Sequence, residues 1–101
     1  IVVGQMYRRI AGGASDAGMP REHIVDAGRD PHDVLALLRG MLEPGDVVLV
    51  KGRDTQHLER IWLALEGRTV GCRLVFCDVR TRCERCPMLE RGWPDARRVA
   101  R

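Results

Sequence analysis

Short apolar runs along the first two-thirds of the chain alternate with longer segments in which apolar residues recur every three or four positions. The apolar runs are Ile1–Val3, His23–Ala27 and the valine-rich Asp46–Val50. Continuous apolar runs of this length are typical of strands that are buried on both faces of a parallel sheet. The pattern therefore predicts three short buried strands.

Three helices are predicted between and after these strands. They are expected to run from Met6 to Ala17, from Pro31 to Leu42, and from a cap at Asp54 or Thr55 to Leu65. Asp30 before Pro31 is a strong start signal, because the carboxylate caps the helix and proline fits its first position. Pro44-Gly45 and Gly67 supply stop signals. Strand and helix alternating three times predict a mostly parallel sheet covered by helices.

Residues 69–77 show a different pattern, because only every second residue is apolar. The apolar positions are Val70, Cys72, Leu74 and Phe76. Strict alternation is typical of a strand with one buried face, so we expect an edge strand here, antiparallel to the others. Residues 78–101 show no periodicity.

Composition and charge narrow the class of protein. The 101 residues are 45% hydrophobic, which suits one soluble domain, and no apolar run is long enough to span a bilayer. The sequence does not open on a leader peptide, so we expect a cytoplasmic protein without a membrane partner. Residues 68–101 carry nine arginines against four acidic residues, so this end is basic.

All four cysteines lie within a span of fifteen residues, as Cys72, Cys77, Cys83 and Cys86. The C-x2-C pair at the end of this run is the spacing that presents two thiolates to one zinc ion. In a cytoplasmic chain such thiols favour a metal over disulfides. We therefore predict a structural zinc bound by the four cysteines, in a small Cys-rich knuckle.

One geometric objection leaves alternatives open. In an extended strand Cys72 and Cys77 would lie about 16 Å apart and on opposite faces, whereas four zinc ligands lie within about 4 Å of one another. If Cys72 is a core residue instead, the other three cysteines need a fourth ligand, for which a histidine or a carboxylate would serve. A chain that binds no metal and an iron–sulfur cluster are the remaining alternatives.

The stretch EPGDVVLVKGR at residues 43–53, followed by LERI at 58–61, carries a resemblance to a known family. With VVGQMYRRIAGGASDAGMP at residues 2–20 and DPHDVLALLRGML at 30–42, it resembles the C-terminal domain of the Mur ligases, closest to the type that adds D-alanyl-D-alanine. The resemblance covers roughly residues 1–66. It implies a three-layer, Rossmann-like α/β domain, which we place at residues 1–71. The apolar alternation, the cysteine spacing and the arginine content separately predict an edge strand and Cys-rich knuckle at 72–93 and an Arg-rich tail at 94–101.

The resemblance also implies a function and a site. Mur ligases use ATP and magnesium to join an amino acid or dipeptide to a nucleotide-linked muramyl carboxylate in peptidoglycan precursor synthesis. Their C-terminal domain closes over the nucleotide and the incoming substrate, which assigns substrate binding to Lys51, Gly52 and Arg53. The usual serine is replaced by Arg53, and the P-loop of the family's central domain does not occur here. This chain is therefore expected to need the remaining ligase domains for activity.

A second interpretation is a non-enzymatic α/β module whose Arg-rich zinc knuckle binds nucleic acid or a protein partner. Two copies could also pair through the exposed edge of the predicted sheet. His23, His32 and His57 are each expected to be surface histidines without a chemical role.

Overall fold

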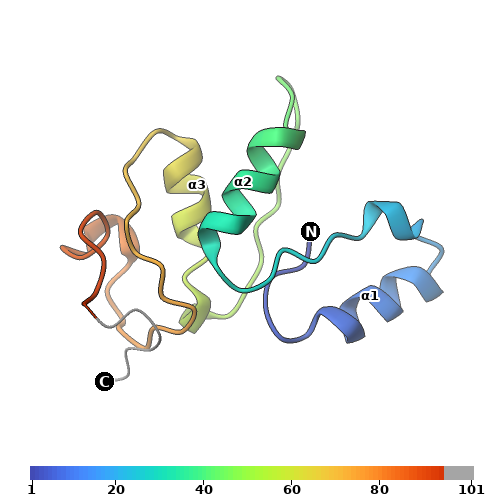
Figure 1. Ribbon diagram of the computed structural model, residues 1–101, viewed down its shortest axis with the longest axis horizontal. Coiled ribbons are helices and arrows are strands. Elements are labelled where there is room, and N and C mark those ends of the chain that lie inside the picture. The colour runs from blue at the N-terminus through green and yellow to red at the C-terminus, as the bar shows by residue number, and fades with distance from the viewer. Residues whose placement is uncertain (95–101) are drawn as a thin grey trace.

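The computed structural model describes residues 1–94 of the chain (Figure 1). It contains three α-helices and three short 3-10 helices. These are α1 (Tyr7–Asp16), η1 (Arg21–His23), α2 (Pro31–Met41), η2 (Asp54–Gln56), α3 (Glu59–Leu65) and η3 (Cys83–Arg85). All three predicted helices are confirmed, although the third begins several residues later than its expected cap because the chain turns at His57.

Helix α2 forms as its local sequence predicts. The Asp30 side chain accepts a hydrogen bond of 2.9 Å from the His32 N–H, and Pro31 occupies the first turn. The helix buries the apolar face formed by Val34, Leu35 and Leu38. This face packs against α3, and the hydrophobic core of the described residues lies between these two helices and the chain at Val70, Cys83 and Leu89.

The prediction of a parallel sheet is wrong. Within residues 1–94 no extended strand forms. The bridge residues are Val2 and Asp26, which make one isolated parallel bridge, and Cys77, so the fold is not Rossmann-like. Residues 46–50 form no strand, and Val47 and Leu49 are 95% and 88% exposed. A valine-rich run becomes a buried strand only when neighbouring strands cover its hydrogen-bonding edges, and periodicity alone does not reveal whether those neighbours exist.

The predicted edge strand at residues 69–77 also does not form. Three of the four residues on its predicted apolar face are buried, and the fourth, Phe76, is partly buried. Val70, Cys72 and Leu74 are buried. In place of a strand ladder, the N–H groups of Gly71 and Cys72 both donate to the Leu89 carbonyl, at 2.8 and 2.9 Å. The predicted pairing of two copies through a sheet edge therefore has no edge to use in the described part of the chain.

Helix α1 stands apart from the α2–α3 pair, on the opposite side of the molecule from the Cys-rich segment (Figure 1). None of its residues is buried, and Ile10 is 51% exposed. No helix in residues 1–94 is both long and apolar enough to cross a membrane. Of the predicted Arg-rich tail, residues 95–101 lie outside the described residues.

Candidate metal centre

His57 occupies an unusual backbone position between η2 and α3. Its φ of 46° and ψ of 51° are left-handed, and it is the only non-glycine residue with a positive φ among residues 1–94. Such a conformation costs free energy and persists only where the surrounding structure fixes it. The His57 N–H donates to the Asp54 carbonyl, and the His57 carbonyl accepts from the Arg60 side chain. The turn thus holds a buried imidazole in a fixed place.

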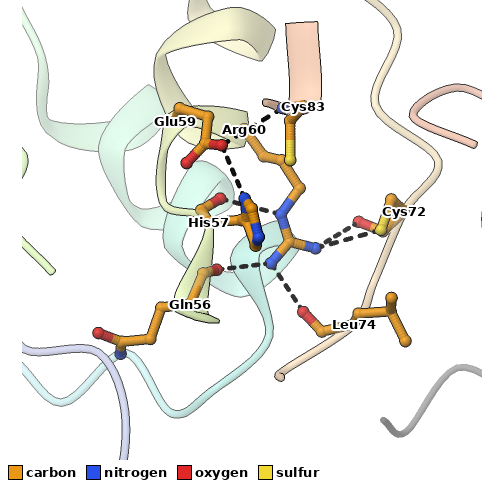
Figure 2. A network of polar contacts seen from close by, with 7 residues as sticks. All are labelled: Gln56, His57, Glu59, Arg60, Cys72, Leu74 and Cys83. Carbon is orange, nitrogen blue, oxygen red and sulfur yellow. Dashed lines mark hydrogen bonds and ion pairs between the residues drawn. The ribbon is translucent and has the colours of Figure 1, made fainter. Parts of the chain in front are cut away.

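A second segment brings a cysteine to this imidazole. His57 Nδ1 lies 2.8 Å from Glu59 Oε1, which also accepts a hydrogen bond of 3.3 Å from the Cys83 N–H (Figure 2). One donor atom from each of His57, Glu59 and Cys83 lies within 4.8 Å of the other two. We call these three residues the His–Glu–Cys cluster. It joins the start of α3 to η3, elements that pack against each other.

The three side chains offer the donor atoms that zinc prefers, namely an imidazole nitrogen, a carboxylate oxygen and a thiolate sulfur. Burial, followed by the neighbouring Glu59 carboxylate, raises the pKa of Cys83 to about 12. Cys83 is therefore a thiol at neutral pH in the metal-free protein. A metal must displace its proton on binding, as is usual for thiolate ligands.

Glu59 is ionised in the same surroundings. Its partial burial would raise the pKa of the carboxyl, but the hydrogen bond with His57 and the backbone N–H groups of Glu59 and Cys83 outweigh burial and lower it. A carboxylate beside an imidazole nitrogen and a thiol is arranged to accept a cation. The cluster and the four cysteines could hold a metal.

The buried side chain of Arg60 fixes the backbone turn that carries His57. It is 1% exposed, and its five N–H groups make five hydrogen bonds, to the carbonyls of Gln56, His57, Cys72 and Leu74 and to the Cys72 sulfur (Figure 2). The guanidinium therefore ties the His57 turn to the chain at residues 72–74. None of these acceptors is a carboxylate, so a buried positive charge lies close to the cluster without a direct anionic partner among the described residues.

The structure does not gather the four predicted zinc ligands into one site. Cys83 is in the cluster, whereas Cys72 is 6% exposed and contacts Arg60. Cys77 is half-buried, and its N–H donates to the Thr55 carbonyl. Cys86 donates its N–H to the Cys83 carbonyl, which closes the expected turn of the C-x2-C pair. All four thiols are free.

The three residues assigned to substrate binding, Lys51, Gly52 and Arg53, line an open cleft of about 810 Å³. Its other walls come from residues 1–6, residues 48–50, the chain at Val75 and Phe76, and side chains of α2 and α3 that include Val34, Leu38 and Ile61. We call it the basic cleft, because Arg29, Lys51 and Arg53 line it and no acidic residue of the described chain does. A Cβ atom at Gly52 would meet the end of the Leu58 side chain, so a larger residue at this position requires Leu58 to shift.

Sequence reasoning missed most of the cluster. His57 was expected at the surface but is 8% exposed, and neither Glu59 nor Arg60 was singled out. The spacing of His57 and Glu59 is too common to indicate a metal site. The useful signal was the need for a histidine or a carboxylate to complete an incomplete cysteine set.

Comparisons with known proteins supply no further assignment. No protein-family model, curated protein or solved structure matches this chain. The functional conclusions therefore rest on the residues and geometry described above.

Proposed function

We propose that this protein binds one zinc ion at His57, Glu59 and Cys83, and that the ion fastens residues 72–94 to α3. The observation that carries the proposal is the convergence of three different zinc donors within 4.8 Å from segments 24 positions apart in the sequence. The left-handed conformation of His57 supports it, because backbone strain of this kind concentrates at functional sites.

The donor set favours zinc over other common cations. Calcium and magnesium take shells of oxygen ligands, whereas imidazole and thiolate suit zinc. The role is structural, since η3 and its flanking chain have no sheet and little helix to hold them within the described residues. Metal binding between α3 and η3 adds its free energy directly to the free energy of folding.

The proposal is tested by zinc titration of the wild type and three single variants, with the fold checked by circular dichroism. The wild type should bind one zinc. His57→Asn, which keeps a residue that tolerates positive φ, and Cys83→Ser should each weaken binding at least tenfold. Cys86→Ser is the matched control and should bind like the wild type. Loss of binding in Cys86→Ser with full binding in His57→Asn would contradict the proposal and favour a cysteine-only site.

The basic cleft supports a second candidate function. We propose that the chain is the substrate- and nucleotide-closing part of a Mur-ligase-like, ATP-dependent ligase, with Lys51 and Arg53 facing an anionic substrate. The supporting observation is that these residues and Arg29 line one cleft that no described acidic residue shares. Cationic side chains in such a cleft attract phosphate and carboxylate groups.

This second candidate is tested with a nucleotide-linked muramyl tripeptide as the ligand. The wild type should bind it with an affinity that falls as salt increases, and the double variant Lys51→Gln, Arg53→Gln should bind at least tenfold more weakly. The control replaces Arg8 and Arg9 of α1 with Gln, which removes the same charge outside the cleft. Equal binding by all three proteins, or none by the wild type, would reject the assignment.

A further inference from the structure

The His–Glu–Cys cluster lacks one ligand for a closed zinc site. Structural zinc is almost always bound by four protein ligands in a tetrahedron. Within the described residues only three donors lie together, from His57, Glu59 and Cys83. A zinc ion bound there would therefore recruit either a fourth protein ligand or a molecule from solution.

The open side of the cluster faces a cavity of about 820 Å³, which we call the outer cavity. His57 and Glu59 line it, and Cys77 lines it as well. The backbone of Cys77 is already attached to the cluster's own turn, because its N–H donates to the carbonyl of Thr55, two residues before His57, at 2.9 Å. Cys77 is thus the thiol that shares a cavity with two cluster residues.

The charge of the site favours an anionic fourth ligand. Zinc bound by a carboxylate, a thiolate and a neutral imidazole carries no net charge. The buried guanidinium of Arg60 then leaves one positive charge, since its hydrogen-bond acceptors are carbonyls and a sulfur atom. A second thiolate would neutralise it, and an uncompensated buried charge is costly.

An anion from solution is a less favourable source of this negative charge than a second thiolate of the protein. Besides Glu59, the outer cavity is lined by the carboxylates of Asp54, Asp78 and Glu84 and by the guanidinium groups of Arg80 and Arg82. Even without Asp78, the acidic residues of this lining outnumber its two arginines, so the cavity attracts a divalent cation on its way in and disfavours a free phosphate or carboxylate.

We propose that Cys77 is the fourth zinc ligand, so that two cysteines, one histidine and one glutamate form a closed centre that excludes Cys72 and Cys86. This rests on the proposed zinc site. Zinc binding draws the Cys77 sulfur toward the cluster and brings the outer cavity's wall closer to α3. Cys72 instead remains the thiol partner of Arg60, and Cys86 remains outside the coordination shell.

Cobalt substitution tests the proposal, because each cobalt–thiolate bond adds to the charge-transfer absorption in the near ultraviolet. The wild type loaded with Co²⁺ should show about twice the charge-transfer absorption per cobalt of Cys77→Ser, since two sulfur bonds become one. Cys86→Ser is the matched control and should equal the wild type. Imidazole, a neutral ligand, should leave the wild-type visible spectrum unchanged and should shift that of Cys77→Ser, whose fourth position is open.

The other outcomes separate the two proposals. Equal charge-transfer absorption in wild type and Cys77→Ser, with a wild-type spectrum that responds to imidazole, would overturn the fourth-ligand assignment and leave the zinc site standing. A charge-transfer band that is absent, or that survives Cys83→Ser unchanged, would overturn both. Alkylation of the zinc-loaded protein by iodoacetamide, read by mass spectrometry, gives an independent check: Cys77 should be protected and Cys86 modified.

Discussion

Helices α1 and α3 differ more in their surroundings than in their helical patterns. α1 has ten residues, none of them buried, whereas α3 has only seven and buries Arg60, Ile61, Leu63 and Ala64. Short helices in water are stabilised mainly by the face they bury and much less by intrinsic propensity. The stability of this protein therefore concentrates around α3, where the candidate metal centre also lies.

The chain segments next to the two helices also differ in how firmly hydrogen bonds attach them to the rest of the protein. The chain after α3 is held by the Arg60 hydrogen bonds and by the contact of Gly71 and Cys72 with the Leu89 carbonyl. The chain before α1 is joined to the rest by the bridge of Val2 with Asp26, by the hydrogen bond from the Gly4 N–H to the Gly28 carbonyl, and by the bond from Gln56 Nε2 to the Val3 carbonyl. Local opening should therefore begin at α1.

Removal of the Arg60 side chain should lower the free energy of unfolding more than any other change considered below. Arg60→Met leaves carbonyls of residues 56, 57, 72 and 74 buried without this donor, and we expect it to lower the free energy of unfolding by about 3 kcal/mol or more. Arg9→Met, on the exposed α1, should change it by less than about 0.5 kcal/mol. Urea unfolding followed by circular dichroism measures both, and similar values for the two variants would contradict the account.

A methyl group at Gly71 should have an intermediate effect. The Cβ of Gly71→Ala would overlap the Glu90 carbonyl oxygen and push apart the two segments that carry Cys72 and Leu89. Overpacking of this kind costs about 1–3 kcal/mol. Gly40→Ala is the matched control, since its Cβ meets nothing within 4 Å in α2 and should stabilise the protein by about 1 kcal/mol. A thermal melt that shifts in the same direction for both variants would be inconsistent with this packing.

The pairing of Asp30 with Arg73 should give the smallest effect, and one that depends on pH. Partial burial would raise the pKa of Asp30, but the His32 N–H and the Arg73 guanidinium, 2.7 Å away, lower it below its usual 3.8. Its contribution is therefore present above about pH 4 and is lost as the pH falls through the lowered pKa. Asp30→Asn keeps a helix cap and removes the charge, so it should cost about 0.5 kcal/mol at pH 7, because Arg73 is exposed.

The direction of the Asp30 pKa shift is tested by measuring, as a function of pH, the difference in unfolding free energy between the wild type and Asp30→Asn. The difference should shrink as the pH falls below 3.8 and through the lowered pKa of Asp30. A difference that grows on acidification would show that the Asp30 carboxyl is not stabilised in its ionised form.

The helices were predictable from sequence because their signals are local. Asp30 and Pro31 start α2 through contacts within one turn, and the apolar spacing of residues 34–38 identifies its buried face. The sheet was not predictable in the same way, because a strand depends on partners that a periodic pattern does not name. Residues 46–50 have the composition of a buried strand but are not buried.

The candidate site shows the same limit. Sequence spacing indicated a thiol-rich segment and the need for a further ligand, and Cys83 does lie in the cluster. It could not indicate that His57 and Glu59 meet Cys83 across 24 positions, because that contact depends on the packing of η3 against α3. Nor could it indicate that Arg60 would be buried, since arginine is rarely found in a core.

The X-ray absorption spectrum at the zinc edge of the zinc-loaded protein measures which atoms bind the ion, and so tests His57, Glu59 and Cys83 as its ligands. We expect a mixed shell, with nitrogen and oxygen ligands at about 2.0–2.2 Å and at most two sulfur ligands at about 2.3 Å. The lighter scatterers should diminish in His57→Asn. A shell of four sulfur atoms, or a protein that retains no zinc, would contradict the assignment of His57, Glu59 and Cys83 as the metal centre.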